Sequence, residues 1–174
     1  MRILKPIFTI LVLSLVIFGI YEYFIFPVLN RNNVTLVHMI DPDSLLVREN
    51  GKVKVVQLIG ADAPELTGLN KDRQCYDYQA RRLAALRYFS GDRTVKLTAD
   101  GQLGDKDVYN RELRYVTLAN GTLYNEEIIK DGLAKESNPQ NKDYKEKEEF
   151  LKAQADAQSA GVGIWNKRTC RGQF

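Results

Sequence analysis

Three carboxylates and one amide lie close together in the sequence around a predicted β-hairpin. They are Asp43, Gln57, Asp62 and Glu65. Two β-rich runs flank the dipeptide Asn50-Gly51, which is a strong signal of a type I′ turn. With these two residues at the turn, Ser44 faces Gln57 across the hairpin. The four polar side chains are therefore expected to gather at its open end.

Carboxylates that crowd together repel one another unless a positive charge sits among them. Hard divalent cations such as Ca²⁺ prefer oxygen ligands of this kind. The sequence has no cluster of His and Cys ligands, so zinc is not indicated, and the single histidine, His38, is interpreted as structural. The alternative for the acidic residues is a solvated turn, because Asp and Pro are natural turn formers. Spacing alone favours that alternative.

The elements that must position these residues are short strands and helices. β-rich runs predict the strands, and apolar residues at helical spacing predict the helices. Strands are expected at 34–40, 44–49, 52–59, 94–98 and 112–118, and helices at 76–89, 125–131 and 143–160. This pattern fits a mainly β, α+β fold, namely a five-stranded OB-fold-like Greek-key barrel with three helices.

Several short segments resemble those of the staphylococcal nuclease (thermonuclease) family. The resemblance runs from about Val34 to Trp165, and the segments occur in the family's order. Any one of them is a weak signal, but together in this order they are a strong one. They are Ile40-Asp41-Pro42-Asp43-Ser44 for the family's I-D-G-D-T, Leu58 to Glu65 for its strand ending in D-T/A-P-E, Tyr109-Asn110-Arg111 for Y-G-R, Leu123-Tyr124-Asn125-Glu126 for V-N-E, Asp131-Gly132-Leu133-Ala134 for G-L-A, and Gly163-Ile164-Trp165 for I-W.

The resemblance implies a Ca²⁺-dependent nuclease that cleaves the phosphodiester bonds of DNA and RNA. Asp43 and Asp62 match two aspartates that hold the cation, with help from the backbone carbonyl of Ala63. Glu65 matches the glutamate assigned as general base or as positioner of the attacking water. Arg111 matches an arginine that binds the scissile phosphate. A cation and a guanidinium fork both stabilise the negative charge that develops on the phosphate.

Two further positions carry substrate-binding expectations. Tyr109 is expected to approach a phosphate beside Arg111, with simple packing as the open alternative. Gln57 stands where the family has a second phosphate-binding arginine, and a neutral hydrogen bond contributes about 0.5–1.5 kcal/mol against about 1.5–3 for a charged one. Lys54 is not a substitute, because its odd offset from Gln57 places it on the other face of the strand. We expect Gln57 at a strand end open to solvent.

The residue Gln57 separates two functional interpretations. The first is a Ca²⁺-dependent phosphodiesterase weakened at that position. The alternative is a catalytically impaired OB-fold module that binds nucleic acid or another partner. A purely structural protein is disfavoured, because two metal-binding aspartates, the glutamate and Arg111 occur together. No protein partner is inferred.

The N-terminal segment predicts a membrane anchor. An apolar run from Ile7 to Leu29, interrupted by Glu22, is long enough for the roughly 20 residues that a membrane helix needs. It lacks the small residues of a signal-peptide cleavage site, so an uncleaved anchor is favoured over a cleaved signal or a core helix. Arg2 and Lys5 precede the run, which predicts a single pass through the cell membrane with the N-terminus inside and the domain on the extracytoplasmic side.

The expected organisation is an anchor (1–29), a linker (30–33), a nuclease-like domain (34–168) and a tail (169–174). The chain has 174 residues and a net charge of +3, which is weak support for a polyanionic partner. Its two cysteines, Cys75 and Cys170, can form one disulfide in an oxidising compartment, which is the favoured expectation. Separate buried thiols are the alternative.

Overall fold

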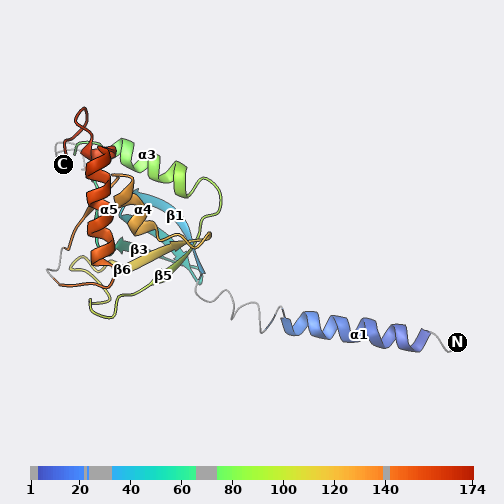
Figure 1. Cartoon of the computed structure of the whole chain (residues 1–174). Coiled ribbons are helices and arrows are strands. Elements are labelled where there is room, and N and C mark those ends of the chain that lie inside the picture. Colours follow the sequence, from blue (N-terminus) through green and yellow to red (C-terminus); the bar gives the residue numbers. More distant parts are fainter. Residues whose placement is uncertain (1–3, 22, 24–32, 66–73, 139–141) are drawn as a thin grey trace. The chain divides into compact units, whose positions relative to one another are not determined.

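The computed structural model describes residues 4–21, 23, 33–65, 74–138 and 142–174 (Figure 1). The chain divides into two units, Met1–Asn33 and Val34–Phe174. Each unit is described here by itself.

The N-terminal unit contains one described helix, α1 (Leu4–Ile20), of 17 residues. It is shorter than the roughly 20 residues needed to cross the hydrocarbon core. None of the helices in the described ranges has the length and apolar character of a membrane span. The transmembrane helix predicted over residues 7–29 is therefore not found, and residues 22 and 24–29 of that range lie outside the described residues.

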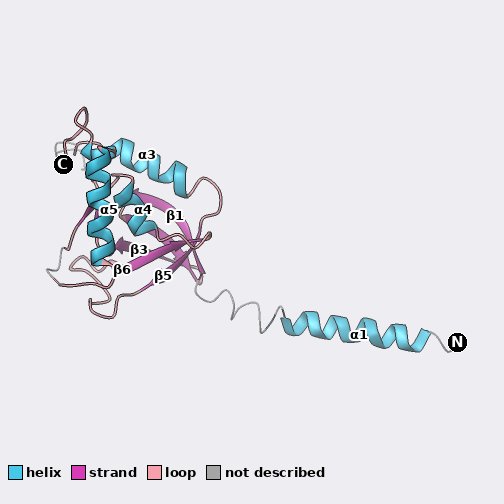
Figure 2. Ribbon diagram, in the orientation of Figure 1, coloured by secondary structure: helices cyan, strands magenta, loops and turns pink. Residues whose placement is uncertain are grey.

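The second unit is built on a closed barrel of five strands, in the order β1-β2-β3-β6-β5 (Figure 2). Strands β3 and β6 run parallel, while the pairs β1–β2, β2–β3 and β5–β6 are antiparallel. The Leu36 amide donates to the Arg93 carbonyl at 2.9 Å, across the junction of β1 with the start of β5. The predicted five-stranded barrel is confirmed. Its strands are β1 (Asn33–Asp41), β2 (Ser44–Glu49), β3 (Lys52–Leu58), β5 (Thr94–Thr98) and β6 (Glu112–Leu118).

The three helices predicted for this unit are also present. They are α3 (Asp77–Tyr88), α4 (Tyr124–Lys130) and α5 (Lys147–Ala160), followed by the 3₁₀ helix η2 (Gly163–Trp165). Helix α5 begins four residues later than predicted, because Tyr144 and Lys145 bond elsewhere: the Tyr144 hydroxyl donates to Glu136 and the Lys145 amide to Asp100. A small sheet of β4 (Ala61–Asp62) and β7 (Lys135–Glu136) was not predicted, since strands of two residues have no periodicity to detect.

The β2–β3 hairpin has the predicted turn and register. Asn50 and Gly51 have φ angles of 50° and 78°, as a type I′ turn requires. Ser44 pairs with Gln57, and the Leu58 amide donates to the Asp43 carbonyl at 2.8 Å. The hairpin therefore carries Asp43 to the same end of the barrel as Gln57.

Asn125 joins helix α4 to strand β6 and to the residue that follows β3. Its side chain is fully buried; its carbonyl oxygen accepts from the Val116 amide at 2.8 Å, and its amide donates to the carbonyls of Ile59 at 2.9 Å and Arg114 at 3.2 Å. These bonds connect α4 to backbone groups of the barrel, where buried polar atoms need partners. The asparagine of the V-N-E segment thus supports the strand that leads toward Asp62.

The glycines of two other family segments meet at the end of α4. Gly132 has a φ of +64°, and a Cβ atom there would lie 2.5 Å from the Val162 carbonyl oxygen. The Ile164 amide donates to the Gly132 carbonyl at 2.9 Å. This close backbone approach requires glycine and packs η2 against the end of α4.

A disulfide joins Cys75 to Cys170, which are 95 residues apart. It links the segment before α3 to the C-terminal residues. The Gly172 amide also donates to the Ile164 carbonyl at 2.7 Å, so the segment expected as a tail, residues 169–174, is held against η2.

Candidate active site

A cavity of about 360 Å³ opens at the end of the β2–β3 hairpin. It brings together six of the seven residues predicted to bind metal or substrate or to act in catalysis, and the seventh, Ala63, is next to it in the chain. The lining residues are Asp43, Gln57, Ala61, Asp62, Glu65, Lys106, Asp107, Val108, Tyr109, Arg111, Leu113 and Ser137.

Asp43 lies at the base of this cavity, in the turn between β1 and β2, and is 4% exposed. Its carboxylate accepts a hydrogen bond from the Ala63 amide at 3.1 Å. Helix α4 stabilises this turn, because the buried hydroxyl of its residue Tyr124 donates to the Pro42 carbonyl at 2.9 Å. The position of this carboxylate is therefore defined by the barrel and by α4 together.

Burial makes the Asp43 carboxylate hard to ionise. Desolvation, followed by the charges of Asp62 and Asp41, raises its pKa from 3.8 to about 7, against the opposing hydrogen bonds from Ala63 and Gln57. The pKa of Asp62 is also raised, by partial desolvation of its carboxylate and then by the charge of Glu65, with Lys135 opposing. Two neighbouring carboxylates with raised pKa values form a site that a cation would stabilise.

The donor set at this cavity fits a hard cation. Asp43 and Asp62 supply carboxylate oxygens, and the Ala63 peptide lies next to the Asp43 carboxylate. Within the described ranges no three His, Cys, Asp or Glu side chains have the geometry to hold a metal together. The remaining ligands would be backbone carbonyls and water, which Ca²⁺ accepts and which a structural zinc site does not use. Glu65 lines the same cavity without completing a three-carboxylate cluster, contrary to the crowding expected from the sequence.

Arg111 is held at the rim of the cavity by its neighbours. Its Nε donates to Asp107 at 2.6 Å, and its Nη1 donates to the Ser44 hydroxyl at 3.2 Å. Asp107 also accepts from the backbone amides of Arg111 and Tyr109, both at 2.9 Å. The Tyr109 ring, 77% exposed, lies under the guanidinium carbon at 5.3 Å. A guanidinium has five N–H donors, so donors remain for a phosphate.

Gln57 lies deeper than predicted. It is 9% exposed, so the expectation of a strand end open to solvent is wrong; the reason is that β6 pairs alongside β3 here, with Gln57 opposite Leu113. The Ser44 hydroxyl donates to Gln57 Oε1 at 2.5 Å, and the Gln57 side chain hydrogen-bonds to Asp43. Hydrogen bonds thus run from Arg111 through Ser44 to Gln57, whose side chain also lowers the pKa of Asp43.

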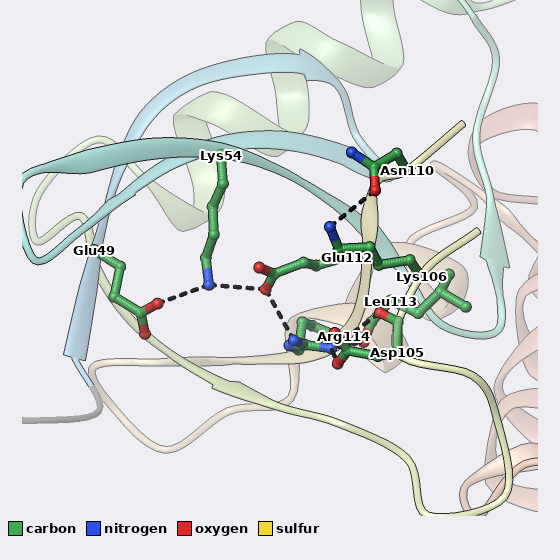
Figure 3. A network of polar contacts seen from close by, with 8 residues as sticks. All are labelled: Glu49, Lys54, Asp105, Lys106, Asn110, Glu112, Leu113 and Arg114. Carbon is green, nitrogen blue, oxygen red and sulfur yellow. Dashed lines mark hydrogen bonds and ion pairs between the residues drawn. The ribbon is translucent and has the colours of Figure 1, made fainter. Parts of the chain in front are cut away.

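Lys54 is engaged away from this cavity, as its place on the strand predicts. Figure 3 shows its ammonium between two carboxylates, Glu49 at 2.7 Å and Glu112 at 2.8 Å. Glu112 also pairs with Arg114 at 2.9 Å, and Arg114 with Asp105 at 2.7 Å. The ion pairs of Asp105 and Glu112 with Arg114 hold the chain on both sides of Arg111. The ion pairs of Lys54 leave it unable to replace the arginine that the family has at the position of Gln57.

Two residues of the site were not singled out in the sequence. Asp107 stands four residues before Arg111, a spacing at which opposite charges often pair, and Ser44 was known only as the partner of Gln57. Glu65, on the other hand, is exposed, and its backbone amide donates to the Gln74 side chain at 2.5 Å. Residues 66–73, which follow Glu65, lie outside the described residues.

Comparison with known proteins agrees with this geometry. Residues 55–167 match the family model described as staphylococcal nuclease homologue. The chain belongs to the staphylococcal nuclease family. It is 32% identical over 137 residues to a thermonuclease of Staphylococcus hyicus, covering 79% of this chain and 78% of that protein. The identity to a thermonuclease of Staphylococcus intermedius is also 32%, over 74% of this chain and 73% of that protein. The endonuclease YncB of Bacillus subtilis is 32% identical over 78% of this chain and 62% of its own length.

Family membership supports nuclease activity at the level of the family and nucleic acid as the substrate class. The segments that carry the match include the hairpin strand with Gln57 and the loop with Arg111.

The raised pKa of Asp43 predicts a pH-dependent stability for the metal-free protein. Since the folded pKa is about 7 and the ordinary value is 3.8, stability is full below about pH 4, falls as the pH rises toward 7, and then levels off, with a loss on the order of 4 kcal/mol. Urea unfolding in chelator, from pH 4 to pH 8, measures this slope. Asp43→Asn should flatten it, whereas Asp156→Asn, on the exposed face of α5, should leave it unchanged. A constant unfolding free energy in the wild type would contradict the burial of an ionisable Asp43.

Proposed function

We propose that this protein is a Ca²⁺-dependent phosphodiesterase that hydrolyses DNA and RNA, with a rate reduced by glutamine at position 57. The observation that carries the proposal is the single cavity lined by Asp43, Asp62, Glu65 and Arg111. Two acidic ligands, a base and a guanidinium are the groups that phosphodiester hydrolysis needs in one place.

In this proposal Asp43 and Asp62, with the Ala63 carbonyl, hold the cation. A bound Ca²⁺ would supply positive charge to the phosphate oxygens. Arg111 binds the same phosphate through the donors that Asp107 and Ser44 leave free, and its guanidinium stabilises the added negative charge of the transition state. Glu65 accepts a hydrogen bond from a water molecule and orients it toward phosphorus.

The second candidate is a catalytically impaired module that binds nucleic acid. One observation favours it: the buried Gln57 side chain is oriented by the Ser44 hydroxyl bound to its carbonyl oxygen, so it offers a phosphate neutral N–H donors at most. Against this second candidate, one cavity is lined by all four groups that hydrolysis would need, namely Asp43, Asp62, Glu65 and Arg111.

Calcium binding and hydrolysis should both depend on Asp43. We expect the full chain, in mild detergent, to bind Ca²⁺ in calorimetric titration and to degrade single-stranded DNA and RNA with Ca²⁺ but not with chelator. Asp43→Ala should abolish both activities, because the buried ligand is lost. Glu65→Gln should retain Ca²⁺ binding and slow hydrolysis by about 10²–10⁴-fold. Asp156→Ala is the matched control and should behave as wild type. Unchanged Ca²⁺ affinity in Asp43→Ala would sink the metal assignment.

Restoring an arginine at position 57 should raise the Ca²⁺-dependent rate. Loss of one transition-state donor costs about 10²–10³ in rate, so Gln57→Arg is expected to gain up to that factor in kcat. Because Gln57 is 9% exposed, the larger side chain should also cost about 1–3 kcal/mol of stability, measured by urea unfolding. Gln57→Met removes the polar amide without adding charge and should give no gain.

Two results would contradict this account of Gln57. If wild type is inactive and Gln57→Arg restores nothing, the impaired-module interpretation is correct. If wild type is fully active and Gln57→Arg slows it, another group supplies the missing charge.

We also propose that the second unit lies on the extracytoplasmic side of the cell membrane, attached through the N-terminal segment. The disulfide between Cys75 and Cys170 supports this location, since disulfides persist in oxidising compartments. In intact cells, both cysteines should resist alkylation until a reductant is added, and protease added outside should digest the domain. Free thiols in freshly lysed cells, with protection from external protease, would count against this location.

A further inference from the structure

A second cavity, of about 340 Å³, lies between strand β1 and helix α3. This β1–α3 cavity shares no lining residue with the candidate active site. Its lining residues are Leu36, Val37, His38, Met39, Tyr78, Arg81, Arg82, Ala85, Phe89 and Arg93. A volume of this size is within the range of sites that bind small molecules or part of a polymer.

Three arginines surround the β1–α3 cavity without acidic partners. Arg81 and Arg82 come from α3, and Arg93 from the segment before β5. No ion pair joins their guanidinium groups to any residue in the described part of the chain, and no Asp or Glu lines the cavity. The whole chain has a net charge of only +3. The cavity therefore has a local positive charge, and its unpaired guanidinium groups are ready to bind phosphate.

The remaining lining residues are mostly apolar or aromatic. Leu36, Met39 and Phe89 are buried and form an apolar lining. Tyr78 is 49% exposed, so its ring is accessible from solvent, and the chain's single histidine, His38, is exposed on the same cavity. A ligand suited to this site carries both anionic groups and flat apolar groups.

We propose that the β1–α3 cavity binds a single-stranded segment of nucleic acid outside the catalytic cavity. Sites for single strands combine a positively charged groove with aromatic side chains on which bases stack, and this cavity has both. The assignment of nucleic acid as ligand rests on the proposed function. The cavity's own strand, β1, ends at Asp41, two residues before the buried Asp43. A nucleic-acid strand held here would thus contact the β-strand that leads into the turn carrying Asp43. Its binding would increase the local concentration of phosphodiester bonds.

The test separates binding at this cavity from catalysis. A triple variant of the full chain combines Arg81→Gln, Arg82→Gln and Arg93→Gln. Its affinity for a fluorescent 12-nucleotide DNA strand is measured by anisotropy in chelator, so that binding is measured without hydrolysis. We expect affinity to fall at least about tenfold, and the salt dependence of log K to become shallower by up to about 2, since each phosphate contact with a single strand contributes roughly 0.7. With Ca²⁺, turnover of the small diester bis(p-nitrophenyl) phosphate should stay unchanged, because it does not reach the β1–α3 cavity.

A control with the same loss of charge distinguishes the cavity from net charge. Lys152→Gln, Lys167→Gln and Arg168→Gln replace three exposed cations away from both cavities, and this variant should bind as wild type. Equal loss of affinity in the two triple variants, or none in the first, would overturn the proposal. If no phosphodiester is turned over by wild type but the first variant alone loses DNA binding, the proposed hydrolysis fails and the binding site stands.

Tyr78 gives an independent measure of base stacking. Wild type should bind the DNA strand about tenfold more tightly than an abasic strand of the same length, and Tyr78→Leu should reduce that preference. The single variant Arg82→Glu, at an exposed helix position, repeats the charge test if the triple variant does not fold. If wild type and Tyr78→Leu prefer the normal DNA strand over the abasic strand by the same factor, nucleobase binding is overturned in favour of a general polyanion site.

Discussion

The Asp43 carboxylate is buried, and a buried charge is unstable unless donors or a cation compensate for the water it has lost. The Ala63 amide and the Gln57 side chain provide part of this compensation. The Tyr124 hydroxyl fixes the turn by bonding to Pro42. Each of these groups comes from a different part of the chain, so the barrel, the β4 segment and α4 all have to be in place for the carboxylate to be held. The pKa of about 7 shows that these donors alone do not restore a normal carboxylate, which is why a cation fits this position.

The same requirement explains the orientation of Gln57. An arginine at this position would carry charge toward the cavity, whereas the glutamine amide hydrogen-bonds to Asp43 and its carbonyl oxygen accepts from Ser44. Ser44 in turn accepts from Arg111. The glutamine therefore places a neutral side chain between the Asp43 carboxylate and the hydrogen bond that joins Ser44 to the Arg111 guanidinium. The active site and the β1–α3 cavity are alike in one respect, since each places guanidinium groups at a cavity in a chain of small net charge.

Local sequence patterns determined much of the second unit. The five barrel strands and three helices lie close to the ranges expected from periodicity and from the Asn50-Gly51 turn. The pairing of Ser44 with Gln57 also followed from that turn, because a two-residue hairpin loop defines the register of its strands. The hairpin register placed Asp43, Asp62 and Glu65 together, and the match to family segments gave their expected roles and added Arg111; these segments are short and contiguous and so can be read without a fold.

Only the tertiary structure decided the environment of those residues. The burial of Gln57 depends on the parallel pairing of β3 with β6, which joins segments far apart in the sequence and leaves no local signal. The late start of α5 and the short β4–β7 sheet likewise arise from contacts between distant elements. Arg81 and Arg82 of α3 line a cavity only because β1 packs beside them. Periodicity reports which face of an element is buried, but the partner that buries it is chosen by the packing of the whole barrel.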